Sequence, residues 1–185
     1  SYADYIEDTI YCNDRSISSI TGSIQGITFT NEGYGTNNIF YMSAEQNNRN
    51  HSPSLNCSNV NDRFTVSTSK GNGALIVPIG LLTTDEVAFA GAYANDLMSG
   101  TIITNKSYYL YLSKTSWWTM TPSNFAGGRA RVGDVYRDGD IEVDSVHNDR
   151  TVRPVVSLKS DVELEGTGTS DNPFVISGVP KPSSQ

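Results

Sequence analysis

The first apolar repeat in the chain predicts a short amphipathic helix. Tyr2, Ile6 and Ile10 recur at intervals of four residues, and acidic residues lie between them. A helix over residues 2–11 would gather the apolar positions on one face and leave the acidic side chains on the other. The polar residues that follow Cys12 end this predicted helix.

Isolated apolar residues separated by glycines come next, and they favour short strands joined by loops over residues 17–41. Residues 45–61 are almost all polar, so we expect an exposed, mobile loop there. Residues 62–67 alternate between polar and apolar side chains, as a half-buried strand does. A glycine-containing turn then leads into the apolar run 74–77.

The clearest local pattern is a capping box at residues 83–86. Thr83 is placed to accept a hydrogen bond from the amide of Glu86, and the Glu86 carboxylate can reach back to the amide of Thr83. Apolar or small residues follow at helical spacing: Val87, Ala90, Gly91 and Ala94. The sequence therefore predicts a second helix from about residue 84 to residue 94.

Aromatic and apolar runs in the second half of the chain predict strands. Residues 108–112 and 117–120 are rich in Tyr, Trp and Leu. Residues 152–158 form a further predicted strand, in which Pro154 favours a sheet edge or a bulge. Two short helices in the N-terminal half and a twisted antiparallel sheet in the C-terminal half together describe an α+β domain.

The Asp138-Gly139 pair predicts a two-residue hairpin turn between strands at 129–132 and 141–143. Such a turn sets the register, because its flanking residues lie opposite each other. The predicted cross-strand pairs are Arg137 with Asp140, Tyr136 with Ile141, and Val135 with Glu142. Gly133 lies where the alternation slips, so we expect a bulge there.

Length and charge narrow the classes of protein and partner. The 185 residues suit one domain over 1–178, followed by a Pro- and Ser-rich tail over 179–185 that we expect to be disordered. The net charge of −7 opposes binding to nucleic acid or to an anionic membrane. No apolar run approaches the roughly 20 residues that span a bilayer. The opening residues have no signal-peptide pattern, so we expect that any export signal or anchor has been removed or was never included.

The two cysteines, Cys12 and Cys57, lie among polar, turn-forming residues. This setting suits a surface disulfide, which would stabilise the fold by about 3 to 4 kcal/mol and imply an oxidising compartment. Two free, partly exposed thiols are the alternative. Metal binding is not predicted, because a third and a fourth ligand are missing nearby.

Three motifs in a fixed order resemble a known fold. In chain order, they are Leu81-Leu82-Thr83-Thr84-Asp85-Glu86, Ser116-Trp117-Trp118-Thr119-Met120-Thr121-Pro122-Ser123 and Val152-Arg153-Pro154-Val155-Val156. A Tyr-rich predicted strand lies between the first motif and the second. The chain resembles the C-type-lectin-like fold over about residues 74–158, and more loosely at residues 12–15 and 166–174. More closely, it resembles an uncharacterised family of bacterial surface proteins, some with prepilin-type N-termini and some diversified by retroelements. That family is related to the formylglycine-generating-enzyme branch of the fold.

The resemblance implies a ligand-binding face between the Trp-rich strand and the Val-Arg-Pro strand. By position, this predicted face comprises Arg129, Arg131, Asp134, Tyr136, Arg137, Asp138, Asp140, Glu142, Asp144, His147, Asn148, Asp149 and Arg150. Trp118, in the preceding strand, is added to it as the tryptophan that would line a ligand site. Two differences from proteins of this fold limit the activities that the resemblance implies. The C-terminal region has no cysteine for formylglycine-type chemistry, and the chain has neither the Glu-Pro-Asn nor the Gln-Pro-Asp tripeptide of calcium-dependent lectins.

The charged residues between Arg129 and Arg150 allow two interpretations. Arginine forks and a tyrosine ring suit a recognition surface, but an ordinary solvated hairpin would also carry charges that neutralise one another across its strands. Trp117 and Trp118 should face opposite sides of a strand, with one of them in the core. The other either lines a ligand site or is also structural, and the second alternative is the favoured one. Asp140, Glu142 and Asp144 share a strand face, but they are too spread to close around a metal without other ligands.

No catalytic residues and no cofactor are predicted. The only histidines are His51 and His147, and neither has a serine or cysteine nucleophile in a recognisable setting. The leading hypothesis is an adhesin-like module on a bacterial surface or pilus that binds a protein or glycan. The alternative is a minor pilin or pseudopilin that contacts other pilin subunits, with residues 1–11 as the remnant of its assembly helix. An enzyme of unknown class is the third.

Overall fold

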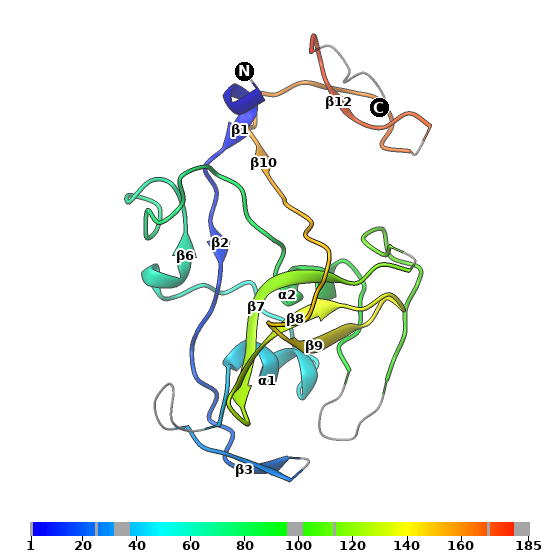
Figure 1. Ribbon diagram of the computed structural model, residues 1–185. Helices are drawn as coiled ribbons and strands as arrows, with labels where there is room; N and C mark the ends of the chain where they lie inside the picture. The colour runs from blue at the N-terminus through cyan, green and yellow to red at the C-terminus, as the bar shows by residue number, and fades with distance from the viewer. Residues whose placement is uncertain are drawn as a thin grey trace.

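The computed structural model describes residues 2–24, 26–31, 38–95, 102–112, 114–169 and 171–179. Within them the protein is a mixed α/β structure that is mostly sheet (Figure 1). Its main element is a curled antiparallel sheet of four strands in the order β5-β7-β8-β9. These strands are β5 (Ile39–Phe40), β7 (Trp117–Ala126), β8 (Arg129–Val135) and β9 (Ile141–Ser145).

Two α-helices lie in the described part of the N-terminal half, α1 (Met42–Asn48) and α2 (Thr84–Phe89). The predicted capping box of α2 is confirmed, because Thr83 Oγ accepts from the Glu86 amide at 3.1 Å and Glu86 accepts from the Thr83 amide at 2.7 Å. Helix α2 is shorter than predicted and ends at Phe89. Gly91 has a φ of 113°, which turns the chain out of the helix.

Four two-stranded ribbons surround the sheet. They pair β1 (Ile6–Glu7) with β10 (Ser157–Leu158), β2 (Tyr11–Cys12) with β6 (Arg63–Phe64), β3 (Gly22–Ile24) with β4 (Ile27–Phe29), and β11 (Leu164–Glu165) with β12 (Val175–Ile176). Short 3₁₀ helices lie at η1 (Tyr2–Tyr5) and η2 (Val60–Asp62). Figure 1 shows β1, β10 and β12 at one end of the molecule and β3 at the other.

The helix predicted over residues 2–11 is wrong beyond its first turn. Ile6 pairs with Leu158 in a ribbon, and Ile10 is 43% exposed. The side chain of Tyr11, which lies outside the apolar repeat, is the buried one. Its hydroxyl donates to the carbonyls of Pro78 at 3.0 Å and Val155 at 3.2 Å. Contacts from distant segments, not helical periodicity, decide the conformation here.

The loop predicted over residues 45–61 is wrong at its start, which belongs to helix α1. The polar residues Asn47 and Asn48 are buried there and have specific partners. Asn47 donates to Thr84 Oγ1 at 3.2 Å, and Asn48 donates to the carbonyl of Asn95 at 2.9 Å. A polar stretch can thus be a core helix when its amides find partners elsewhere in the fold.

The strand predicted at 117–120 is confirmed, because these residues lie within β7, but three other predicted strands are shortened or absent. Residues 108–112 form a turn instead of a strand. Of residues 62–67 only the two residues of β6 are extended in a sheet, and of 152–158 only the two of β10. In the apolar run 74–77, Ile76 is 94% exposed. The predicted tail over 179–185 lies outside the described residues apart from Val179.

The hairpin turn is confirmed at Asp138-Gly139, but the predicted register is wrong by one residue. The amide of Tyr136 donates to the Asp140 carbonyl at 2.9 Å, and Val135 lies opposite Ile141. The connection therefore has three residues and ends in a bulge at Gly139, whose φ is 91°. A Cβ at Gly139 would lie 2.1 Å from the Asn105 carbonyl oxygen, so only glycine fits.

A bulge does lie beside Gly133, but its extra residues are in β7. Three residues of β7, between the pairs Trp118–Asp134 and Pro122–Val132, lie opposite Gly133 alone. A Cβ at Gly133 would lie 2.3 Å from the Thr84 methyl group. Gly133 is required by the close approach of helix α2 to the sheet, and not by strand pairing.

The main hydrophobic core lies between helix α2 and one face of the sheet. It contains Val87, Ala92, Ala94, Tyr108, Trp117, Val135 and Ile141. A second cluster, of Ile20, Phe29, Phe40, Ala44 and Ala126, packs around the other end of β7. The core covers one face of β7, β8 and β9, and leaves their other face for the site described below.

Candidate functional site: the polar face of the sheet

The face of the sheet turned away from the core carries a row of polar side chains. Trp118, Asp134 and Glu142 are cross-strand neighbours on β7, β8 and β9, so their side chains share one face. The prediction that Trp117 and Trp118 divide between the two faces is confirmed, since Trp117 is fully buried in the core and Trp118 is half-buried. We call this side of the sheet the polar face; it comprises Trp118, Asp134, Asp140, Glu142, Asp144 and Arg150.

Residues 146–150 cross the sheet on this side, and we call them the strap. The strap leaves β9 at Ser145 and returns beside the start of β7, where the Trp118 amide donates to the Thr151 carbonyl at 3.0 Å. Arg150, its last residue, holds the strap in place. Its Nε donates to Asp134 at 2.9 Å, its Nη2 pairs with Asp144, and its guanidinium lies 5.8 Å from the centre of the Trp118 ring.

The remaining carboxylates of the polar face are held by an amide. Asn95 Nδ2 donates to Asp140 at 2.6 Å and to Glu142 at 3.2 Å. Asp134 and Asp140 are fully buried, and one oxygen of each has no hydrogen-bond partner among the described residues. Four carboxylates thus face one guanidinium, which leaves an excess of negative charge beneath the strap.

This environment changes the acidity of two of its carboxyl groups. Burial raises the pKa of Asp134, although the hydrogen bond and charge of Arg150 oppose the shift. Burial, and after it the charges of Asp140 and Asp134, together raise the pKa of Glu142 to about 7. Glu142 therefore titrates close to neutral pH.

Exposed members of the predicted face divide between two ends of the sheet. At one end, the turn after β7 and the strap lie side by side, because the Val146 amide donates to the Ala130 carbonyl at 3.2 Å. We call this surface the contact end, and its exposed side chains are Arg129, beside the start of the strap, and Val146, His147, Asn148 and Asp149, along the strap. At the opposite end, Arg137 lies 5.0 Å from the Tyr136 ring centre and Asp138 pairs with Lys106 at 3.5 Å.

Arg131 belongs to neither group. It is half-buried and donates to Asn124 Oδ1 at 3.0 Å, which ties β8 to β7. No group of three or more His, Cys, Asp or Glu side chains within the described ranges is arranged to hold a metal ion. The structure therefore brings six of the predicted residues together on the polar face and separates the others by the length of the strands.

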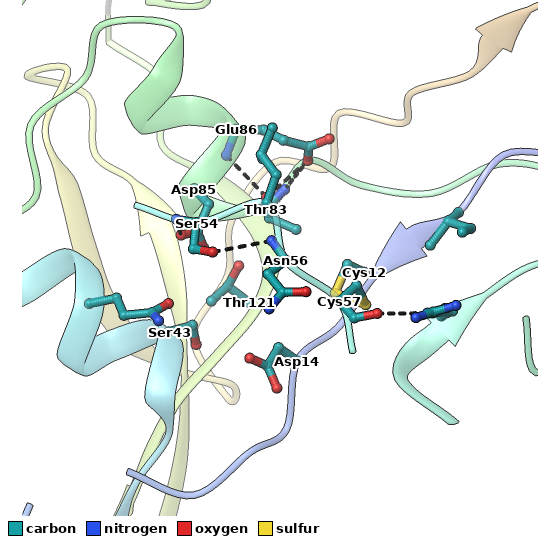
Figure 2. A pocket seen from close by; sticks show the side chains of 14 residues that line it. Cys12, Asp14, Ser43, Ser54, Asn56, Cys57, Thr83, Asp85, Glu86 and Thr121 are labelled. Carbon is teal, nitrogen blue, oxygen red and sulfur yellow. Dashed lines mark hydrogen bonds between the residues drawn. A yellow bond between two sulfur atoms is a disulfide. The ribbon is translucent and has the colours of Figure 1, made fainter. Parts of the chain in front are cut away.

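The predicted disulfide between Cys12 and Cys57 is present, and it borders a pocket that sequence reasoning missed. Figure 2 shows this pocket between the disulfide, helix α1 and the start of helix α2; its volume is about 470 Å³. The capping box and the cysteines were recognisable in the sequence, but their convergence with Asp14 and Gln46 depends on the fold. We call it the disulfide pocket.

No protein-family model, curated protein or solved structure matches this chain. The family resemblance drawn from its motifs therefore stays a prediction. None of the described helices is long and apolar enough to cross a membrane.

Proposed function

We propose that this protein is an extracellular, adhesin-like binding module of a bacterial surface or pilus, and that it binds a protein ligand with the contact end of its sheet. The observation that carries the proposal is the clamp of Arg150 on Asp134 and Asp144, which fixes the strap across the sheet. The disulfide supports an oxidising compartment. The curled antiparallel sheet with two helices supports the further proposal of a C-type-lectin-like fold.

A fixed strap suits recognition because binding residues work best on loops that a rigid scaffold positions. The Arg150 clamp lies at the C-terminal end of the strap. His147, Asn148 and Asp149, which precede it in the chain, are exposed. Holding these side chains in place before binding reduces the entropy lost when a partner docks. Of the fourteen predicted contact residues, Asp134 and Asp140 are fully buried, and we assign them to the support of this surface.

The character of the exposed side chains favours a protein over a glycan. Arg129 and Asp149 carry opposite charges, and His147 and Asn148 add hydrogen-bonding groups. A mixed, exposed set of this kind matches the polar, adaptable surfaces with which binding domains meet other proteins. A small saccharide is better held in a concave site.

The experiment compares two ends of one sheet on arrays of purified extracellular proteins and of glycans. We expect the variant Arg129→Ala/His147→Ala/Asn148→Ala/Asp149→Ala to lose about tenfold or more of the wild-type signal on a protein target. The matched control Lys106→Ala/Arg137→Ala/Asp138→Ala changes exposed residues at the opposite end and should keep that signal. Both variants should melt close to the wild-type temperature, because surface changes rarely affect stability.

Two results would contradict the proposal. Equal capture by the contact-end variant and the wild type would remove the contact end as the binding surface. Signals on the glycan array alone would show that the ligand class is wrong.

The alternative of a minor pilin or pseudopilin stays a prediction. It depended on residues 2–11 as the remnant of an assembly helix, and residues 6–7 and 11–12 are strands.

A further inference from the structure

The disulfide pocket has walls from segments that are far apart in the sequence. Ser43 and Gln46 come from helix α1, Thr83 and Asp85 from the start of helix α2, and Thr121 from β7. Segments 10–14 and 54–57, joined by the disulfide, close the remaining side. Figure 2 shows the side chains of these segments around one space.

Hydrogen bonds fix these walls without a ligand. Asp85 Oδ1 accepts from the Ser54 amide at 2.6 Å, which ties the 54–57 segment to helix α2. Arg63 Nε donates to the Cys57 carbonyl at 2.6 Å, and its Nη2 donates to the Ser58 carbonyl at 3.2 Å. The pocket is therefore preformed, as small-molecule sites usually are.

The charges that line the pocket are unbalanced. Three carboxylates, Asp14, Asp85 and Glu86, lie against one cation, Arg63. The guanidinium of Arg63 is directed to the two backbone carbonyls named above. Glu86 is engaged by Thr83 in the capping box. Neither Asp14 nor Asp85 forms an ion pair with any residue that the structure describes.

The two unpaired carboxylates differ in burial. Asp85 is 6% exposed, and burial raises its pKa even though the Ser54 amide and Asn47 donate to it. Asp14 is half-buried, and one of its oxygens accepts from the Ser16 amide at 2.9 Å. A positive charge brought into the pocket would be attracted by both groups and would favour the ionised form of Asp85.

We propose that the disulfide pocket binds a small ligand through a primary ammonium group, which is held by Asp14 in the negative field of Asp85. Gln46 and Asn56 line the pocket and offer amide groups to hydroxyls on the same ligand. Leu55, which is 64% exposed, provides an apolar edge. Phosphates and other anions are disfavoured because the lining has a formal excess of negative charge.

This inference goes beyond the proposed function, since no residue of the contact end lines the pocket. Free amines and the lysine side chains of proteins share the ammonium group. The 470 Å³ volume suits a whole small molecule, so the test uses small molecules first.

The experiment follows backbone amide shifts by NMR while glucosamine or glucose is added to the intact protein. The two sugars share one ring, and an ammonium group in glucosamine replaces a hydroxyl in glucose. We expect glucosamine and 1,5-diaminopentane to shift the amides of Asp14, Ser54 and Asn56. Glucose should bind about tenfold more weakly or not at all, a difference of about 1.4 kcal/mol.

Variants separate this site from the contact end. Asp14→Asn keeps the shape of the side chain and removes its charge, and we expect it to weaken glucosamine binding about tenfold without changing the melting temperature. The matched control Asp149→Asn removes an exposed charge from the contact end and should leave glucosamine binding unchanged.

Three results would overturn the proposal. The first is the absence of shifts with both amines at about 10 mM, which corresponds to affinity below any useful range. The second is equal binding of glucose and glucosamine, which would mean that hydrogen bonds and not charge hold the ligand. The third is unchanged glucosamine binding by Asp14→Asn. None of these results depends on the outcome of the protein array.

Discussion

The polar face and the disulfide pocket both contain several carboxylates, but they differ in whether a cation pairs with those carboxylates. On the polar face, Arg150 pairs with Asp134 and Asp144, and the strap covers the pair. In the pocket, Asp14 and Asp85 have no cation partner among the described residues, and the space in front of them is open. The carboxylates of the polar face therefore support structure, whereas Asp14, at the open pocket, remains available to a ligand.

The difference shows how burial and pairing together decide the role of a carboxylate. Removing the partner of a buried charge strongly lowers the free energy of unfolding, because the charge is left without a partner or solvation. A carboxylate that borders a preformed pocket can be neutralised at little cost to the fold. Three substitutions test this contrast through their effects on the stability of the protein.

The variant Arg150→Met removes the cation of the polar face and keeps much of its side-chain length. Asp134, which is fully buried, then loses its partner, so we expect the free energy of unfolding to fall by about 3–5 kcal/mol. Urea denaturation measures this. The matched control Arg129→Met, at an exposed site, should unfold close to wild type. A loss of under about 1 kcal/mol in Arg150→Met would show that the ionic cluster does not hold the strap.

The double variant Cys12→Ser/Cys57→Ser opens the wall of the disulfide pocket. The cross-link joins residues 45 apart in the chain, so its loss should lower the free energy of unfolding by about 3–4 kcal/mol on chain-entropy grounds. The same variant should lose glucosamine binding, because residues 54–57 are no longer tied to residues 10–14. Wild type treated with a reductant serves as the parallel sample. Retained glucosamine binding in both would mean that the hydrogen bonds of Asp85 and Arg63 to residues 54–58 maintain the pocket without the disulfide.

The variant Glu142→Gln changes the pH dependence of stability. In the wild type, folding raises the pKa of Glu142 from 4.5 to about 7, so folding takes up a proton between these values and stability falls as the pH rises through them. The variant lacks this loss. Because Glu142 is partly exposed, we expect it to be more stable than wild type by only about 1–2 kcal/mol near pH 8, and similar near pH 4.

Thermal unfolding across that pH range provides the measurement, and Asp149→Asn, on the exposed strap, should follow the wild-type curve. Parallel curves for Glu142→Gln and the wild type would show that Glu142 does not titrate near neutrality.

Local chemistry made part of the fold predictable. The capping box located the start of helix α2, and the Asp138-Gly139 pair located the hairpin turn. These motifs depend on residues close together in the chain. Helix α1 was missed because its buried amides find partners 37 and 47 residues away, at Thr84 and Asn95. No local pattern reports such contacts.

The sequence predicted the region of the candidate site, but not which of its residues are buried supports and which are exposed. Asp134 and Asp138 lie in the same charged hairpin, yet Asp134 is fully buried and the Asp138 side chain is 50% exposed. The strap makes this difference, because it returns across Asp134 on its way to Thr151. Its path depends on pairing with β7, which the charge pattern does not encode. The pocket, assembled from six segments, had no pattern of its own in the sequence.

The ribbon of β1 and β10 determines how the molecule would respond to a pulling force. The two strands are antiparallel, so the chain before Ile6 and the chain after Leu158 leave the ribbon at the same end. Tension on these two segments would load the bond from the Lys159 amide to the Tyr5 carbonyl first and the pairs behind it in turn. Bonds that break one at a time yield at low force. This end of the protein would therefore unzip and lengthen while the disulfide and the four-stranded sheet stay intact.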